Sequence, residues 1–202
     1  MSNNANVNIR VLGVVGSPRR GGNTDLLVDK VLEGTVRAGA KASKIHLGKL
    51  KIAPCRACLG CRRTGRCVVK DDMQGVLDHL DANSIWVLGT PVYFWGPTGW
   101  FKAFMDRFYG AREHIDFSTK SAINVVPFEN DSEGMAEHTV GMLHNALKYL
   151  KVSILADVVV PGVNHKGDVR AHPEKLQDAY RAGEEAVIQS SCRDATGCEQ
   201  AN

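Results

Sequence analysis

Four cysteines stand close together in the first half of the chain, at a spacing that suits metal or redox chemistry. Cys55, Cys58 and Cys61 are three residues apart, and Cys67 follows after five intervening residues. Three thiolates at this spacing can surround one face of a [4Fe-4S] cubane, and a fourth can complete the ligand set. The motif also admits free or redox-active thiols. Structural zinc is less consistent with it, because zinc ligands usually fall into two separated pairs.

A glycine-rich segment near the start of the chain has the composition of an anion site. It reads Gly-Ser-Pro-Arg-Arg-Gly-Gly-Asn-Thr over residues 16–24 and separates an apolar stretch from a helical pattern. A phosphate at a helix N-terminus gains from the helix dipole and from unpaired N–H groups. The segment offers hydroxyl groups, an amide, backbone N–H groups and two candidate guanidinium groups, those of Arg19 and Arg20. The segment matches neither the Walker pattern nor Gly-x-Gly-x-x-Gly, and a flexible turn with an N-cap is the alternative.

A second segment could bind a flat ring. It begins with Thr90 and Pro91 and continues with Val92, Tyr93, Phe94 and Trp95. Proline fixes the backbone, and the aromatic side chains offer apolar walls beside backbone donors. The alternative is a strand end that fills the core.

The elements that must position these segments alternate along the chain. Short β-branched runs predict five strands, at residues 7–15, 43–47, 84–89, 121–126 and 152–160. Helical periodicity predicts helices over residues 23–38, 71–81, 98–109, 131–150 and 173–189, the first of them capped by Asn23 or Thr24. This alternation predicts an α/β fold, a doubly wound five-stranded parallel sheet in the flavodoxin-like order 2-1-3-4-5.

The predicted sheet sets where the segments lie. Parallel strands end at one edge, so we expect both loops and the cysteine segment to meet there. One domain would occupy residues 1–190, with a cysteine-rich insertion at 53–68 and an unstructured tail at 191–202.

The helix over residues 98–109 has more aromatic residues than one face normally buries. A subunit interface would explain Trp100, Phe101, Phe104 and Phe108, and ordinary core packing is the alternative. Lys102 and Asp106 are four residues apart and should pair in solvent.

Composition narrows the class of protein. The chain has 202 residues and a net charge of +3, from 25 Lys and Arg against 22 Asp and Glu, with no basic stripe. Nucleic acid is therefore not an expected partner. There is no signal segment and no apolar run long enough for a membrane, so we expect a cytoplasmic protein whose cysteines do not form disulfides.

Three segments together resemble the NAD(P)H-dependent FMN reductase family of flavodoxin-like proteins. They are Gly16-Ser17-Pro18-Arg19 with Gly22-Asn23-Thr24, Thr90-Pro91-Val92-Tyr93-Phe94, and Lys102-Ala103-Phe104-Met105-Asp106-Arg107. The cysteine spacing is similar to that of the iron-sulfur flavoproteins, a branch of the same family. One difference follows the fourth strand, where family members often have a glycine pair and this chain has Phe128 to Gly134.

The resemblance implies an oxidoreductase with FMN as cofactor. In the first loop, the FMN phosphate would be held by Ser17, Arg19, Gly22, Asn23 and Thr24, and residues 91–95 would line the isoalloxazine ring. NAD(P)H would supply a hydride, and a quinone, a flavin, another small molecule or a protein would accept the electrons, through a [4Fe-4S] cluster if the cysteines hold one. No catalytic side chain is expected, since the protein mainly positions the reactants. The resemblance also implies a homodimer or homotetramer. A flavodoxin-type electron carrier and a redox or metal sensor are the alternatives.

Overall fold

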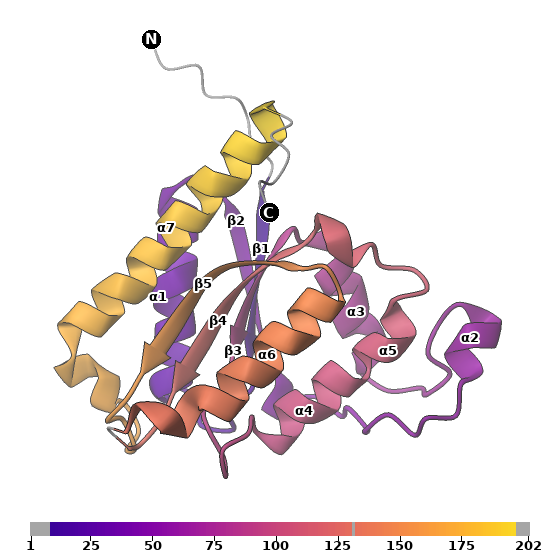
Figure 1. Cartoon of the computed structure of the whole chain (residues 1–202), viewed down its shortest axis with the longest axis horizontal. Helices are drawn as coiled ribbons and strands as arrows, with labels where there is room; N and C mark the ends of the chain where they lie inside the picture. Colours follow the sequence, from indigo (N-terminus) through magenta and orange to yellow (C-terminus); the bar gives the residue numbers. More distant parts are fainter. Residues whose placement is uncertain (1–8, 131, 197–202) are drawn as a thin grey trace.

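The computed structural model describes residues 9–130 and 132–196 as an α/β sandwich around one parallel sheet (Figure 1). The strands follow the order β2-β1-β3-β4-β5. Their bounds are β1 Arg10–Val15, β2 Lys41–His46, β3 Ile85–Gly89, β4 Ser121–Pro127 and β5 Ser153–Val160. All four neighbouring pairs are parallel. The predicted fold class and strand order are confirmed.

The burial of the strands reflects their place in the sheet. Every residue of β3 is buried, and five of the six residues of β1 are buried. The edge strand β2 has no buried residue, which agrees with its polar sequence Lys-Ala-Ser-Lys-Ile-His. Apolar runs therefore mark the strands that are covered on both faces.

Helices cover both faces of the sheet. On one face, α1 (Asn23–Arg37) and α7 (Pro173–Thr196) pack together over side chains such as Val11 and Val87. On the other face, α3 (Met73–Ala82), α4 (Gly99–Asp106), α5 (Phe108–Ala111) and α6 (Glu137–Tyr149) cover side chains such as Leu12 and Trp86. The short helix α2 (Gly60–Thr64) lies away from the sheet, in the cysteine segment.

Several predicted boundaries need correction. The N-cap of α1 is Gly22, so Asn23 and Thr24 begin the helix and do not cap it. The predicted helix over residues 98–109 divides into α4 and α5 at Arg107, and the one over 131–150 begins as a 3-10 turn at Glu133–Ala136. Helix α7 runs on to Thr196, so residues 191–196 are helical where an unstructured tail was expected. Residues 197–202 lie outside the described residues.

The aromatic residues of α4 and α5 belong mainly to the core. Phe101 and Phe104 are fully buried, and Phe108 is 2% exposed. The ring centroids of Phe104 and Phe108 are 4.8 Å apart, at an interplanar angle of 76°. Only Trp100 of the four is exposed. Core packing therefore explains three of the residues that suggested an interface. The Lys102–Asp106 pair forms in solvent, as predicted, at 2.5 Å.

The helices carry no sign of a membrane span. Among the described residues, no helix is both long enough and apolar enough to cross a bilayer.

Candidate functional site

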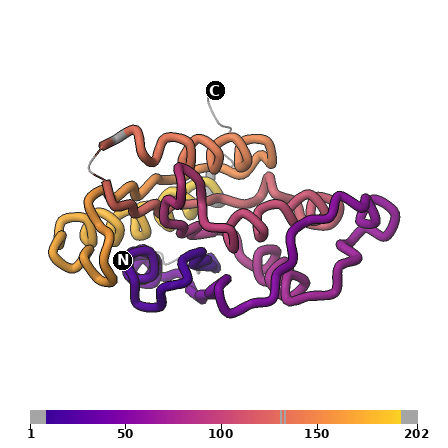
Figure 2. Tube along the Cα trace, turned by 90° about the horizontal axis from the view of Figure 1, so that it is seen from below, coloured from indigo at the N-terminus to yellow at the C-terminus, as the bar shows by residue number. Residues whose placement is uncertain are grey.

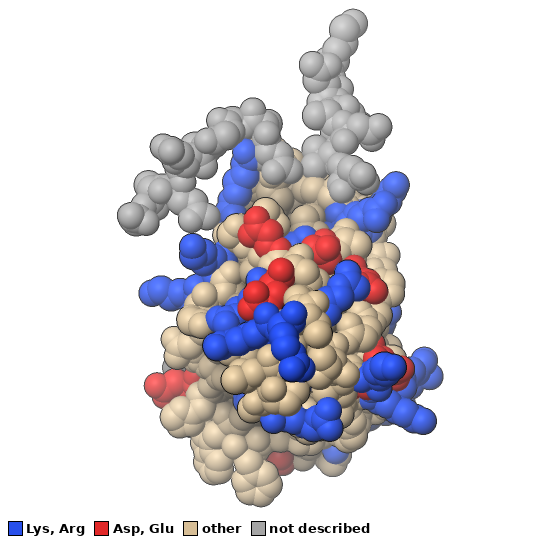
Figure 3. Space-filling view, turned by 90° about the vertical axis from the view of Figure 1, so that its right-hand side faces the viewer, with Lys and Arg blue, Asp and Glu red and all other residues tan. Residues whose placement is uncertain are grey.

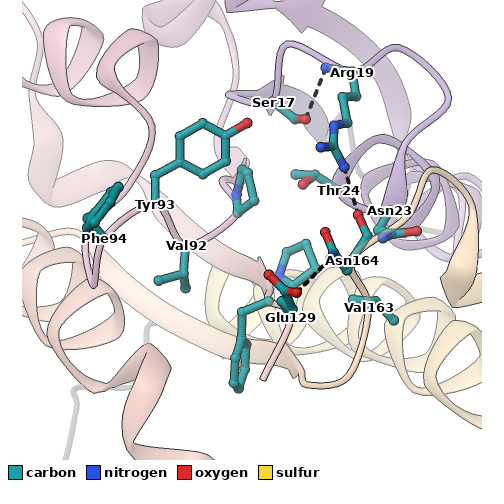
Figure 4. Close-up of a pocket in the computed structure, with 13 residues that line it drawn as sticks. Ser17, Arg19, Asn23, Thr24, Val92, Tyr93, Phe94, Glu129, Val163 and Asn164 are labelled. Carbon is teal, nitrogen blue, oxygen red and sulfur yellow. Dashed lines mark hydrogen bonds between the residues drawn. The ribbon is translucent and has the colours of Figure 1, made fainter. Parts of the chain in front are cut away.

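A cavity of about 330 Å³ opens at the carboxyl edge of the sheet (Figure 4). It lies between the first loop, residues 16–24 after β1, and the third loop, residues 90–96 after β3. Its lining is polar at one end and apolar at the other. The polar end consists of Ser17, Arg19, Asn23 and Thr24. The apolar end consists of Pro91, Val92, Tyr93 and Phe94. The two segments are more than 60 residues apart in sequence, and the parallel sheet brings them to one site.

The polar end lies at the N-terminus of α1. Gly22 caps the helix in an extended conformation without a side-chain cap, so the first-turn N–H groups carry the positive end of the helix dipole. The Ser17 hydroxyl accepts a hydrogen bond from the backbone N–H of Arg19 at 3.2 Å. Thr24 is 2% exposed and lines the cavity. This arrangement provides hydroxyl groups, backbone donors and a guanidinium for an anion.

The side chains of Arg19 and Asn23 also hold the segment that follows β5. Nη1 of Arg19 donates to the carbonyl oxygen of Asn164 at 2.7 Å. Asn23 donates through Nδ2 to the carbonyl of His165 at 2.9 Å, and its Oδ1 accepts from the N–H groups of Gly167 and Val169. Asn23 therefore serves to fix the wall of the cavity, a role that its sequence position did not reveal.

The third loop turns back on itself in a strained conformation. Tyr93 and Gly96 exchange backbone hydrogen bonds of 2.7 and 3.1 Å, which closes a tight turn. Phe94 and Trp95 occupy the centre of this turn with φ of 47° and 62°. Bulky residues adopt such angles at a cost of roughly 1–3 kcal/mol each. The turn leaves the Phe94 side chain 96% exposed at the mouth of the cavity.

Most of the predicted site residues, but not all, line the cavity. Gly22, Thr90 and Trp95 do not line it. Gly22 acts as the helix cap, and Thr90 is buried, where its hydroxyl accepts from the N–H of Thr98 at 3.1 Å. Trp95 lines a neighbouring hollow and accepts at its carbonyl from the Thr139 hydroxyl at 3.0 Å.

Sequence reasoning missed five lining residues. They are Pro127 at the end of β4, Phe128 and Glu129 directly after it, and Val163 and Asn164 after β5. Nδ2 of Asn164 donates to the Glu129 carboxylate at 2.7 Å, which joins these two loops (Figure 4). The loop after β4 thus reaches the cavity without the family's glycine pair. Only the strand order could have predicted these five residues, because the carboxyl ends of β4 and β5 lie at the same edge of the sheet as those of β1 and β3.

A charged cluster of Asp25, Lys44 and His46 supports the first loop. Asp25 accepts from the N–H of Gly21 at 2.7 Å and pairs with Lys44 of β2 at 2.6 Å. Burial opposes ionisation of Asp25, but the bonds from Lys44 and Gly21 outweigh it and hold the pKa below the ordinary value of 3.8. Burial also lowers the pKa of His46, which lies 3.5 Å from Asp25. Asp25 therefore stays ionised and fixes the start of α1.

The cysteine loop lies apart from this cavity, contrary to the expectation that three loops would meet. Viewed onto the carboxyl edge, residues 53–68 project to the side of the sheet that holds α4 and α5 (Figure 2). None of these residues lines the cavity beside α1. The loop departs after β2, the edge strand, and continues across the end of α4.

All four cysteines of the loop line one small hollow. Cys55, Cys58, Cys61 and Cys67 share it with Arg107 and Gly110. Cys61 and Cys67 pack against the backbone of Gly110, where an added Cβ would lie 3.2 Å from the Cβ of Cys61 and 3.6 Å from that of Cys67. Four sulfur donors around one hollow are the ligand type that an iron-sulfur cluster requires. The thiols do not converge on one point, since the described residues contain no group of three metal-binding side chains close enough to hold an ion.

The surface around the hollow is basic. Arg56, Arg62, Arg63 and Arg66 are exposed, and residues 53–68 include no Asp or Glu. Lys and Arg side chains are prominent on the face of the molecule to which this loop belongs (Figure 3). A cluster with four thiolate ligands carries net negative charge, which such surroundings offset.

The fold and the cavity define the class of protein, a flavodoxin-like protein whose first loop leads into the N-terminus of α1 and whose third loop is aromatic. Residues 9–165 match the family model of NADPH-dependent FMN reductases. The chain belongs to this family and is an oxidoreductase of the FMN-dependent type.

Curated relatives point to one branch of the family. An iron-sulfur flavoprotein of Methanocaldococcus jannaschii is 31% identical over 150 residues, which cover 74% of this chain and 77% of the relative. An iron-sulfur flavoprotein of Methanosarcina thermophila is 26% identical over 166 residues, which cover 82% and 84% of the two chains.

Solved structures share the fold at low sequence identity. An NAD(P)H:quinone oxidoreductase from Methanothermobacter marburgensis has a TM-score of 0.73 at 16% identity, covering 89% of this chain and 98% of that one. An FMN-dependent NADH-azoreductase from Bacillus anthracis, in complex with FMN, has a TM-score of 0.64 at 16% identity, with the same coverage. These likenesses establish the fold alone.

Proposed function

We propose that the cavity beside α1 holds FMN and that NAD(P)H reduces this flavin before the electrons pass to a second acceptor. The observation that carries the proposal is the polarity of the cavity, which has an anion site at one end and apolar walls at the other. FMN has the same division, with a phosphate at one end and a flat ring at the other. The family match and the azoreductase complex with FMN support the same assignment.

Within this proposal each loop has a separate task. Ser17, Arg19, Thr24 and the first N–H groups of α1 would bind the phosphate. Val92, Tyr93 and Phe94 would contact the ring, and Phe128 would close the cavity from the loop after β4. Bound FMN supplies the redox chemistry, because it accepts a hydride and can release electrons singly. The side chains position the ring and exclude water from it.

We further propose that the cysteine loop holds a [4Fe-4S] cluster, with Cys55, Cys58, Cys61 and Cys67 as ligands. Support comes from the hollow that all four cysteines line, the close packing of Cys61 and Cys67 on Gly110, and the names of the curated relatives. The loop would draw its thiols together as the cluster is loaded. The protein would comprise one domain that extends to the end of α7, and it would act as a homo-oligomer.

Anaerobic purification tests both assignments separately. We expect the purified protein to contain one FMN per chain and about four irons with matching acid-labile sulfide. It should oxidise NAD(P)H at steady state with a quinone as electron acceptor. Cys61→Ser should lose iron but keep FMN, while Cys192→Ser on α7 should keep both. A preparation that binds flavin but never iron would contradict the proposed cluster. One that holds flavin but oxidises no NAD(P)H would be an electron carrier.

A further inference from the structure

One buried guanidinium holds both ends of the cysteine loop. Arg107 follows the last residue of α4, and its side chain is fully buried. Nη1 donates to the carbonyl oxygen of Ala53 at 2.8 Å and to Oδ2 of Asp71 at 2.7 Å, and Nη2 donates to Oδ1 at 3.1 Å. The same carboxylate accepts from the N–H of Ala53 at 2.9 Å. The start and the end of the loop therefore meet on a single ion pair.

The same guanidinium also contacts a thiol. Nη2 of Arg107 donates to Sγ of Cys67 at 3.3 Å. Its Nε is buried and has no hydrogen-bond partner within residues 9–130 and 132–196, so it retains a donor beside the hollow. Cys67 is the one cysteine of the four for which a side-chain donor is observed in the described structure.

Both partners of the Arg107–Asp71 ion pair stay ionised. Burial disfavours the charged form of Arg107, but its bonds to Asp71 and its contact with Cys67 outweigh this and raise its pKa. Burial likewise opposes ionisation of Asp71, yet the bonds from Arg107 and Ala53 hold its pKa below the ordinary value. A cation of this kind stabilises added negative charge on a neighbouring sulfur.

We infer that Arg107 is a positioning residue for the cysteine loop, and that its N–H···S bond to Cys67 raises the reduction potential of the cluster proposed above. The inference rests on the proposed function for its redox half only. Hydrogen bonds to cluster sulfurs favour the reduced, more negative state, because they offset part of the added charge. The anchoring half depends on contacts within the chain and holds without a cluster.

Four forms of the full-length, anaerobically purified protein test the inference: wild type, Arg107→Gln, Arg107→Lys and Arg63→Gln. The Arg63 variant is the matched control, because it removes an exposed positive charge from the same loop. Arg107→Lys keeps the charge but loses the forked geometry, and it serves if Arg107→Gln does not fold. The readouts are amide hydrogen exchange over residues 53–71 and the cluster midpoint potential by spectroelectrochemistry.

The expected results separate the two halves. In both Arg107 variants, amides at the two ends of the loop should exchange about tenfold faster or more, while Arg63→Gln leaves them unchanged. The midpoint potential should become more negative in Arg107→Gln, and by a smaller amount in Arg107→Lys. Exchange rates and potentials equal to those of Arg63→Gln would overturn the inference. A wild-type protein without iron would contradict both the proposed cluster and the effect of Arg107 on its reduction potential. The exchange rates would still test whether Arg107 anchors the loop.

Discussion

The hydroxyl of Thr98 donates a hydrogen bond of 2.6 Å to the carbonyl oxygen of Gly16, which joins the two loops that form the cavity. The hydroxyl oxygen of Thr98 also accepts a hydrogen bond from the N–H of Phe101 at 3.2 Å and so caps α4. Since α4 ends at the residue before Arg107, this helix connects the cavity with the anchor of the cysteine loop.

Thr98→Val should therefore weaken the protein and its flavin site together. The variant loses an N-cap and leaves the buried carbonyl of Gly16 unpaired, at a cost of about 1–3 kcal/mol in the free energy of unfolding. Urea unfolding and FMN titration measure the two effects. Thr98→Ser keeps the hydroxyl and should resemble wild type. Equal stability of the Val and Ser variants would show that this hydrogen bond does not support the loops.

Gly16→Ala should be destabilising because of close packing. A Cβ at this position would lie 2.7 Å from Cδ2 of Phe101 and 3.0 Å from the carbonyl oxygen of Gly89. Overpacking of this kind costs about 1–3 kcal/mol. Gly141→Ala is the control, because nothing lies within 4 Å of its added Cβ and it is within α6. The control should gain stability in thermal unfolding, and a similar gain at Gly16 would contradict the packing described.

Thr24→Val should weaken binding of FMN but not of riboflavin. The two side chains have nearly the same shape, and Thr24 is buried at the polar end of the cavity. Loss of one hydrogen bond to a charged phosphate costs about 1.5–3 kcal/mol, or roughly 10- to 150-fold in affinity. Fluorescence titrations with both flavins measure this difference. An equal loss for both would place the phosphate elsewhere.

Asp25→Asn should lower stability at neutral pH, and the loss should vanish in acid. The pKa of Asp25 is below 3.8 in the folded protein, so its contribution is present above that value and is lost as the pH falls through the folded pKa. At pH 7 we expect a loss of about 1–3 kcal/mol. Asp29→Asn is the control, since Asp29 also pairs with Lys44 but is 53% exposed. Urea unfolding between pH 2 and 7 checks this, and a loss independent of pH would contradict it.

The sequence was sufficient for the sheet and for most of the cavity. Apolar β-branched runs marked the buried strands, and the parallel order then placed the segments that contain Thr24 and Tyr93 at one edge. The contributions of Phe128 and Asn164 were not predicted, because neither belongs to a local motif. They are at the site only because of where β4 and β5 end.

Three features depend on contacts that no local pattern records. Asn23 is of a residue type that often caps helices, but its side-chain amide forms hydrogen bonds with a segment more than 140 residues away. Arg107 was recognised only as part of a family segment, and its partner Asp71 is 36 residues earlier. Helix α7 continues past Ser190 through polar residues that lack an apolar periodicity.

The most direct test of the account is a titration of the flavin-free protein, with flavin fluorescence as the readout. Our account predicts that FMN is quenched at one equivalent per chain, and that riboflavin, which lacks the phosphate, binds at least about tenfold more weakly. Absence of quenching by FMN, or equal affinity for the two flavins, would contradict the assignment of the cavity.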